Sequence, residues 1–509
     1  MDEALFDKKG VTPEGAAAIA ANIPPELTRL AELTEGAGFC LFAVGGLVRN
    51  SLLRLPVSDI DICSAMPPER MIALCREHGF TVVPKGIAFG MVEVHLGRAR
   101  FEHTTFRSDS YAEGGAHRPS EVRFSSSPEE DAFRRDFSVN AMYFDIRAGY
   151  VLDPTGGLPD LAAGLIRTTS PDPRTVLSDD GLRIMRLVRF AAELGFDIEP
   201  ASMAAAQALV SNLSDISAER IRDELDKILL SDVKYGEVSA PRVFHGLALL
   251  RNVGALDIIL PELCLGRGME QKKGFHRYDV LDHCLHTASE AVPTLPARLA
   301  ALLHDVGKPP VFERTGRMYG HDAEGAELAR EILHRLRYDN KTIDRVTFII
   351  RHHMYDLNNT AKESTLRRTF ARWGYERSLD IADIRTADVH GSGFITGDVA
   401  SAERWRRILA AMKRESAPFS EAELACTGAD IIAWLGIPPG PAVADIKRRM
   451  LAHCAVHPKD NVKERLEKLA SDLYPRPVDR PRRSALQKIC FYLQKLPVIA
   501  CIRHVFRVK

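Results

Sequence analysis

The spacing of apolar and polar positions changes along this chain. Phe39 to Val44 is an apolar run of β-prone residues and Ser58 to Cys63 is a second one, so both segments predict strands. From about residue 160 the apolar positions recur at helical spacing, with a break at Gly195 to Pro200. This pattern continues to about residue 395 and then to about residue 472. We therefore expect an α/β head up to about residue 155, followed by helices.

A glycine turn lies between the two predicted strands. Gly45 and Gly46 allow a tight turn whose backbone N–H groups can approach a phosphate closely. Arg49 adds positive charge on the helix expected after the turn. Asp59 and Asp61 are two residues apart in the second strand, so both carboxylates point to one face. Such a pair can hold Mg²⁺, whose coordination substrate phosphates complete, as a phosphoryl or nucleotidyl transferase requires.

Two further polar segments follow. Arg134 to Met142 comes after an acidic loop, and taken alone it favours a helix start with capping acids. Asp180, Arg183 and Arg186 are spaced by three, so on a helix they fall within about 120° of one another. An Asp and an Arg on one rigid helix can pair with the donor and acceptor edge of a nucleobase. Taken alone, this segment favours an intrahelical salt bridge.

In this order, the four segments resemble the class II tRNA nucleotidyltransferase (CCA-adding enzyme) and bacterial poly(A) polymerase superfamily, from about Phe39 to about Leu230. The resemblance implies that Asp59 and Asp61 are catalytic and bind Mg²⁺, and that Asp180 and Arg183 read the Watson–Crick edge of CTP or ATP. Glu102 is a candidate third carboxylate. The positions that the resemblance assigns to nucleotide binding are Gly46, Arg49, Arg135, Asp136, Asp180, Arg183, Arg186 and Arg189.

Three positions depart from the pattern of that family. Asn50 stands where the family usually has Asp, and Arg54 stands where Gly is common. Asp179 replaces the usual Glu before Asp180. The first two lie beside the predicted turn and the third is a conservative change, so the expected roles are kept.

A second group of ligand-type residues lies in a helical region further on. His and Asp suit transition metals such as Mn, Fe, Co or Ni. Their pattern resembles the HD superfamily of metal-dependent phosphohydrolases over about Phe275 to Gly391. The resemblance implies that four of these residues bind the core metal, namely His283, His304, Asp305 and Asp388. It also implies that His321 and one of His352 or His353 could bind a second metal. The candidate metal ligands are His283, His304, Asp305, His321, His353 and Asp388.

Composition limits the partners and the compartment. The 509 residues include 68 basic and 68 acidic ones, so an RNA footprint must be a local patch. Nine scattered cysteines without a Cys-x-x-Cys pair are typical of a reduced, intracellular protein. We expect no secretory signal, no membrane span and a cytoplasmic location. From Pro475 to Lys509, nine Lys or Arg stand against one Asp. We expect a solvated tail there, with an RNA contact as the alternative.

The predicted fold class is α+β, with an N-terminal nucleotidyltransferase head built on a small mixed sheet. The expected domains are this head (1–155), a helical neck that binds base and RNA (156–270), an HD-like helical domain (271–395) and a C-terminal helical region with the basic tail (396–509). The implied function is template-independent addition of CTP and ATP to tRNA 3′ ends, with tRNA, CTP, ATP and Mg²⁺ as partners. A poly(A) polymerase, an enzyme confined to the CC or the A step, and an HD phosphohydrolase with an RNA-binding head remain alternatives. An added phosphohydrolase activity, a transition metal in the HD-like site and the oligomeric state are open.

Overall fold

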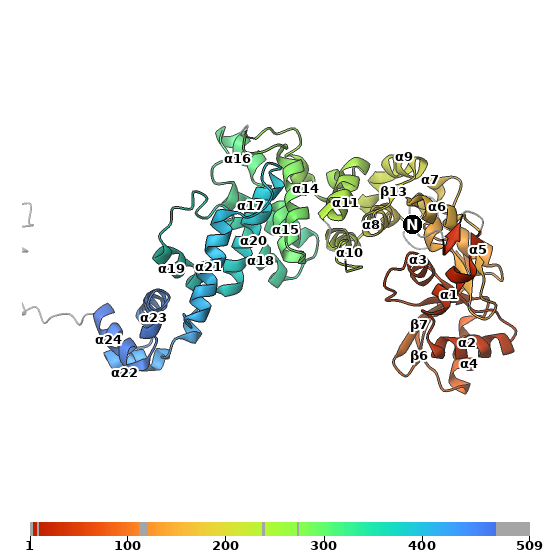
Figure 1. Ribbon diagram of the computed structural model, residues 1–509, viewed down its shortest axis with the longest axis horizontal. Coiled ribbons are helices and arrows are strands. Elements are labelled where there is room, and N and C mark those ends of the chain that lie inside the picture. Colours follow the sequence, from red (N-terminus) through yellow and green to blue (C-terminus); the bar gives the residue numbers. More distant parts are fainter. Residues whose placement is uncertain (1–3, 8–9, 111–120, 237–239, 272–273, 475–509) are drawn as a thin grey trace, which may run out of the picture. The chain divides into compact units, whose positions relative to one another are not determined.

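The computed structural model describes residues 4–7, 10–110, 121–236, 240–271 and 274–474 (Figure 1). The basic segment from Pro475 to Lys509 lies outside the described residues. The chain divides into two compact units, one formed by Met1–Leu357 with Asp380–Glu403 and the other by Asn358–Leu379 with Arg404–Lys509. The expected division into four domains stays a prediction.

The head is built on one seven-stranded sheet in the order β11-β10-β3-β4-β7-β6-β5. β4 and β7 pair in parallel and the other neighbours pair antiparallel, so the sheet is mixed, as the sequence predicts. The strands are β3 (Phe42–Val44), β4 (Asp61–Ser64), β5 (Thr81–Gly86), β6 (Met91–Leu96), β7 (Ala99–Thr105), β10 (Tyr143–Asp145) and β11 (Val151–Leu152). Two-stranded pairs are β1 (Phe6–Asp7) with β2 (Gly10–Val11), β8 (Arg107–Ser110) with β9 (Glu121–Phe124), and β12 (Leu165–Ile166) with β13 (Asp197–Ile198).

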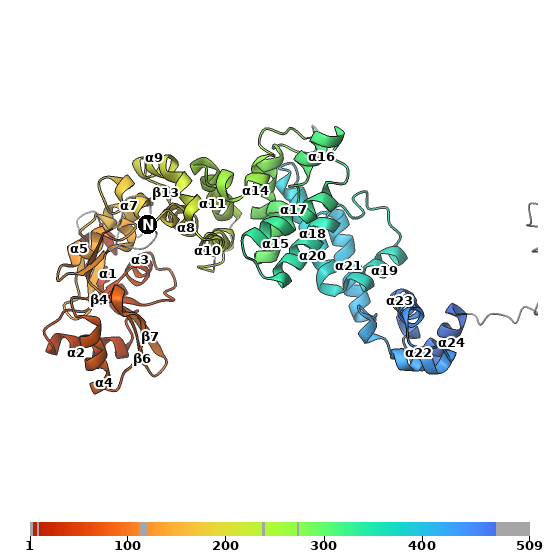
Figure 2. The same cartoon turned by 180° about the vertical axis from the view of Figure 1, so that it is seen from behind.

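Two apolar clusters hold the head together. In the larger one, Leu30 of α2 (Pro25–Gly36) and Met71 of α4 (Pro68–Glu77) belong to the same cluster as Val94 of β6. Figure 2 shows the ribbons of these two helices beside the strands of the head. In the smaller one, the rings of Phe42, Phe106 and Tyr143 contact one another beside β3 and β10. The head helices are α1 (Pro13–Ala20), α2 (Pro25–Gly36), α3 (Gly46–Leu52), α4 (Pro68–Glu77) and α5 (Pro128–Phe133).

Both predicted strands are shorter than their apolar runs. β3 begins at Phe42, and β4 begins at Asp61 instead of Ser58. The register explains the late start of β4, because Asp61 pairs with Val44, the last residue of β3. The next residue, Gly45, has φ 71° and turns the chain away, so the residues before Asp61 have no partner on β3. Asp59 therefore lies in the segment that leads into β4.

The neck is helical, with the predicted break between α8 and α9. α8 ends at Gly195, whose left-handed conformation (φ 68°) closes the helix before the short strand β13. The neck helices are α6 (Gly157–Ala163), α7 (Pro173–Asp179), α8 (Leu182–Leu194), α9 (Pro200–Leu209), α10 (Ala218–Leu229), α11 (Ala240–Val253), α12 (Ala255–Ile259) and α13 (Pro261–Cys264).

Helices also form the rest of the described chain. The histidine-rich region contains α14 (Val280–Glu290), α15 (Leu295–Leu303), α16 (Lys308–Thr315), α17 (His321–Arg335), α18 (Asn340–His352) and the later part of α20 (Tyr375–Gly391). The second unit contains α19 (Glu363–Trp373), most of α21 (Ala400–Arg414), α22 (Gly428–Leu435), α23 (Pro441–Cys454) and α24 (Lys463–Leu473). Among the described residues, no helix combines the length and apolarity needed to cross a bilayer.

A buried ion pair joins the neck to the histidine-rich region. Arg298 of α15 donates from both terminal nitrogens to Asp232, with both N–O distances 2.5 Å, and also to the carbonyl oxygen of Leu229. Both charged side chains are almost fully buried. Removing one partner of such a pair leaves an uncompensated buried charge.

We expect Asp232→Ala to lower the free energy of unfolding by about 3–5 kcal/mol, because Arg298 then stays buried without its carboxylate. Thermal or urea unfolding of the full chain measures this effect. Arg314→Ala, which removes the exposed pair of Arg314 with Glu324, is the control and should leave unfolding almost unchanged. Equal effects of the two substitutions would contradict the structural role of the buried pair.

Candidate functional site

The Gly45-Gly46 turn forms one wall of a cavity of about 330 Å³. A Cβ atom on Gly45 would lie 3.4 Å from Oδ2 of Asp61, and its φ of 71° is one that side chains rarely adopt. Glycine is therefore favoured here because of the backbone conformation of the turn. The cavity is lined by Gly45, Gly46, Arg49, Asn50, Ser58, Asp59, Asp61, Arg135, Asp136, Asn140, Arg186, Arg189, Phe190, Lys234 and Tyr235.

Arg49 reaches the cavity from α3 and is buried. Its guanidinium donates to the amide oxygens of Asn50 and Asn140 and, over 3.4 Å, to the hydroxyl of Tyr235. No carboxylate among the described residues forms an ion pair with Arg49. Burial lowers the pKa of Arg49, because the charged form has lost its water. A buried cation held only by neutral groups favours an anionic ligand.

Asp59 and Asp61 also line the cavity, and both residues are exposed to solvent. Loss of hydration in this hollow raises the pKa of Asp61, Arg135 opposes the shift and Asp59 adds to it. Glu102 on β7 is the register partner of Asp61, and its pKa is also raised, first by burial and then by the Asp61 charge. In the described part of the chain, no Lys, Arg or His pairs with any of these three carboxylates. The group is thus suited to a cation.

Arg135 and Asp136 lie between the head and the neck. Arg135 donates to Asp131, at 3.0 and 3.2 Å, and to the hydroxyl of Tyr143 at 2.9 Å. Asp136 accepts from both Nε (2.8 Å) and Nη2 (2.5 Å) of Arg186. Burial alone would raise the pKa of Asp136, but the Arg186 guanidinium outweighs it and lowers this pKa to about 2. Asp136 is therefore ionised and fixes the position of Arg186.

The predicted helical face of Asp180, Arg183 and Arg186 differs from the structure. Asp180 lies between α7 and α8 and does not belong to α8, and its carboxylate accepts from the backbone N–H of Leu182, the first residue of that helix. Its carboxylate pairs with Arg220 of α10 at 2.5 Å. Arg183 donates to Asp179 and to the carbonyl oxygens of Val176 and Arg134. A cavity of about 310 Å³ is lined by Arg134, Arg135, Asp136, Asp180, Leu182, Arg183, Arg186 and Arg220, and so adjoins the first cavity.

Arg189 also lines the first cavity, but its charge is compensated. It is buried and forms ion pairs with Glu193, one helical turn later, and with Glu224 of α10. The sequence pattern missed Lys234 and Tyr235, which reach the cavity from a turn after α10. No local sequence signal marks these two residues, because the packing of α10 against α8 determines that the turn lies at the cavity.

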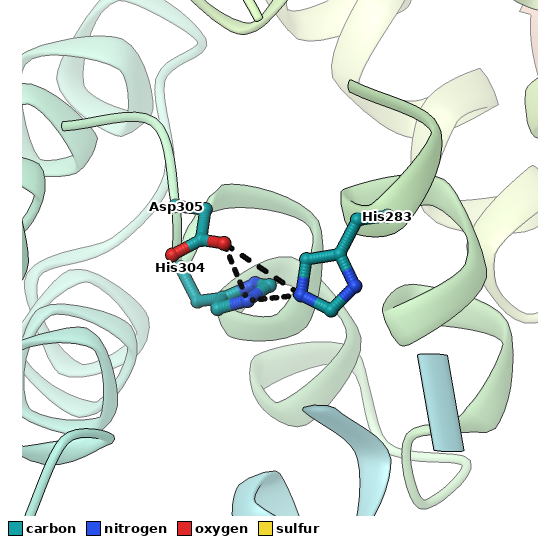
Figure 3. A group of neighbouring side chains, drawn as sticks. All are labelled: His283, His304 and Asp305. Carbon is teal, nitrogen blue, oxygen red and sulfur yellow. Dashed lines mark hydrogen bonds and ion pairs between the residues drawn. The ribbon is translucent and has the colours of Figure 1, made fainter. Parts of the chain in front are cut away.

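The histidine-rich region brings four predicted ligands into one buried group. Nε2 of His283 lies 3.1 Å from Nε2 of His304, 3.1 Å from Oδ1 of Asp388 and 3.6 Å from Oδ2 of Asp305. Figure 3 shows His283, His304 and Asp305 converging on one point. Nδ1 of His304 bonds the carbonyl oxygen of Ala301, which directs Nε2 toward the group.

Asp305 connects this group to a second one. Its Oδ1 lies 3.2 Å from Nε2 of His321 and 3.8 Å from Nε2 of His353, while Oδ2 faces His283 and His304. The structure thus brings His353 to the group, whereas the ring of His352 packs edge-on against Phe348.

The electrostatics of the buried group also favour a cation. Burial opposes a charge on His304, but the Asp305 carboxylate outweighs it and holds the pKa of His304 well above its usual value. The pKa of Asp388 is well below its usual value, because bonds from His283 and His304 outweigh burial. Lys308 was not among the predicted residues of this group. Its Nζ lies 2.5 Å from Oδ2 of Asp305 and forms an ion pair with it. The donor set fits divalent transition metals.

Three family models match parts of the chain. They are the Poly A polymerase head domain (residues 41–167), the probable RNA and SrmB-binding site of polymerase A (195–265) and the HD domain (280–389). An A-adding tRNA nucleotidyltransferase of Deinococcus radiodurans is 32% identical over 80% of this chain and 89% of its own length. A multifunctional CCA protein of Neisseria gonorrhoeae is 33% identical over 69% of this chain and 83% of its own. The crystal structure of the Bacillus stearothermophilus CCA-adding enzyme in complex with CTP matches with a TM-score of 0.65 and 26% identity, over 88% of this chain and 96% of that chain.

We expect the purified chain to bind transition-metal ions, such as Mn²⁺ or Co²⁺, through the histidine–aspartate group. His304→Ala should abolish tight binding, and His321→Ala should lower the number of bound ions, because each removes a ligand from a different side of Asp305. Metal analysis after dialysis measures both. His334→Ala, at an exposed histidine of α17, is the control. Unchanged metal content in His304→Ala would contradict the assignment.

Proposed function

This chain belongs to the tRNA nucleotidyltransferase family, and from this premise we propose that it adds CTP and ATP to tRNA 3′ ends without a template, building or repairing the CCA terminus. The observation that carries the proposal is the first cavity. Its lining holds a buried arginine without a carboxylate partner among the described residues, together with carboxylates that have no cationic partner there. Such a cavity suits a triphosphate bound together with a metal ion.

Nucleotidyl transfer in this family depends on a divalent metal, and we take this ion to be Mg²⁺, held by Asp59 and Asp61. The raised pKa of Asp61 and the absence of a cationic partner among the described residues support this fit. Glu102 is the candidate third ligand, beside Asp61 in the strand register. When bound, the metal activates the RNA 3′-hydroxyl and neutralises charge on the triphosphate.

The protein's own groups hold the triphosphate. Arg49 donates from α3, and the glycine turn at Gly46 brings backbone close to the cavity. Arg135 and Arg186 extend the positive wall, fixed by Asp131 and Asp136. Asn50, where the family usually has Asp, accepts from Arg49 without neutralising it, so the charge of Arg49 stays available to phosphate.

Asp180 and Arg183 select the base in the adjoining cavity. Cytosine and adenine both present an amino donor beside a ring-nitrogen acceptor, so one carboxylate and one guanidinium can read either base. Guanine and uracil present a carbonyl acceptor beside a ring N–H donor, and they fail at both contacts. The ion pair with Arg220 orients the carboxylate of Asp180.

A local basic surface supports RNA as the partner. In the second unit, a cavity of about 290 Å³ between α19 and α23 is lined by Arg368, Arg372, Arg448 and Arg449. Since the chain as a whole has no net charge, such clusters must supply its affinity for phosphates. We place the reaction in the cytoplasm because tRNA is its substrate.

We expect the full chain to incorporate CMP twice and AMP once into tRNA that lacks its CCA end, measured with each of the four nucleotides labelled in turn. Asp59→Asn and Asp61→Asn should each lower the rate by about 10²–10³-fold or more, because the metal loses a charged ligand. Glu77→Gln, at an exposed position of α4, is the control.

Other products would identify the alternatives. Long A tails without C would indicate a poly(A) polymerase. A single A, added only to tRNA that already ends in CC, would indicate an A-adding enzyme. Full incorporation by both Asp variants would contradict the metal assignment.

The buried histidine–aspartate group supports a second activity, metal-dependent hydrolysis of phosphate esters. His283, His304, Asp305 and Asp388 converge on one point, and His321 and His353 share Asp305 from the other side. Two adjacent metal ions can activate water and bind both the attacking and leaving oxygens of a phosphate.

We expect phosphate release from nucleotides or from RNA ends carrying 2′,3′-cyclic phosphate, dependent on a transition metal and abolished by chelation. His304→Ala with Asp305→Ala should remove this activity, whereas Asp59→Asn should retain it, since the two sites use separate ligands. Phosphate assays on the same preparations measure both. Hydrolysis that survives the His304/Asp305 change would contradict the assignment.

A further inference from the structure

Three guanidinium groups converge on the ring of Phe190 at the first cavity. Phe190 lies on α8, is buried and belongs to the lining of this cavity. The Cζ atom of Arg189 lies 3.8 Å from the centroid of the ring, that of Arg49 lies 5.2 Å from it and that of Arg186 lies 5.4 Å from it. All three distances are within the range of about 6 Å in which the quadrupole of an aromatic ring attracts a cation.

The three arginines differ in what else compensates their charge. Arg186 forms an ion pair with Asp136, and Arg189 forms ion pairs with two glutamates. Arg49 has no carboxylate partner among the described residues. Burial lowers its pKa, and the nearby charge of Arg189 adds to this effect. The face of Phe190, which carries negative potential and no net charge, is therefore a source of attraction for Arg49 that does not neutralise it.

An aromatic ring suits this position better than a carboxylate would. A carboxylate beside Arg49 would attract it more strongly, but it would cancel the charge of the arginine and repel the phosphates of a nucleotide. The quadrupole of a ring attracts the cation and leaves the net charge of the cavity positive on this side. The attraction is larger at a buried ring such as Phe190, because water does not compete for the cation.

Resting on the proposed function, we propose that the face of Phe190 positions the arginines that bind the triphosphate, and that it does so without cancelling their charge. Phe190 is a positioning residue, because it acts through Arg49 and Arg186 and does not touch the reacting atoms. Its contribution therefore concerns the phosphates, which CTP and ATP share, and not the choice of the base.

The alternative is that Phe190 only fills space between the helices and the head. Its ring meets that of Phe137 at 75°, with the two centroids 5.7 Å apart, which is an ordinary contact of packed aromatic side chains. Packing depends on the size and shape of the ring, whereas attraction for a cation depends on its electron distribution. Fluorine substitution separates the two, because fluorine withdraws electron density from the face and changes the size of the ring little.

The test places phenylalanine with one, two or three ring fluorines at position 190 of the full chain. The dissociation constants of CTP, ATP and inorganic triphosphate should rise stepwise with the number of fluorines, by the same factor for all three ligands. Phe190→Leu, which keeps an apolar side chain and removes the quadrupole, should weaken their binding about tenfold. The KM for tRNA lacking CCA should stay within about twofold, and the preference for CTP over UTP should not change.

The control is the same fluorine series at Phe144 of β10, a buried ring over which no cation of the described chain lies. It should leave the three dissociation constants unchanged. Constants that stay flat across the series at Phe190, or that rise for the nucleotides and not for inorganic triphosphate, would overturn the inference while nucleotide incorporation by the wild type still supported the proposed function.

Inorganic triphosphate binding needs no RNA and no turnover, so it separates the two proposals. A chain whose triphosphate binding follows the fluorine series but which incorporates no nucleotide would overturn the proposed function alone. A wild-type chain that binds neither the nucleotides nor inorganic triphosphate would overturn both.

Discussion

The structure of the head has to accommodate charged side chains that have no partner of opposite charge among the described residues. Arg49 is buried against amide oxygens, while Asp61 and its register partner Glu102 have no cationic partner among the described residues. Burying the charge of Arg49 without a carboxylate costs several kcal/mol, and packing elsewhere must offset this cost. The apolar clusters on the sheet do so, because they fix β3, β4 and β7 in register. The same polarity suits the cavity to the triphosphate and metal ion that we propose it binds.

Local patterns predicted the parts of the head that depend on neighbouring residues. The glycine turn follows from Gly45 and Gly46, since few other residues adopt a φ of 71°. The mixed sheet and the helical remainder followed from the family resemblance together with the apolar spacing. The start of β4 could not be predicted, because it depends on where the opposite strand turns away. The pairing of Asp180 with Arg220 was also hidden, since these residues are 40 positions apart and meet only when α10 packs beside α8.

In the histidine–aspartate group, too, the residue types could be predicted from the sequence, whereas their arrangement could not. The residue types indicated a metal centre, since His and Asp recur in a helical region without another obvious role. The choice between His352 and His353 could not be made from sequence, because adjacent residues on a helix point about 100° apart and only packing selects one. The central place of Asp305, with one oxygen toward each histidine pair, is a property of the fold alone.

The buried pair of Arg298 with Asp232 bears on how this chain could have been assembled. A shortened chain that kept the head and neck but lost α15 would leave Asp232 without the cation that pairs with it. Deletion would therefore have to be accompanied by replacement of that aspartate with a neutral side chain. The head and neck therefore depend on the histidine-rich region for the partner of one buried charge, and separating the two parts requires a compensating change at their junction.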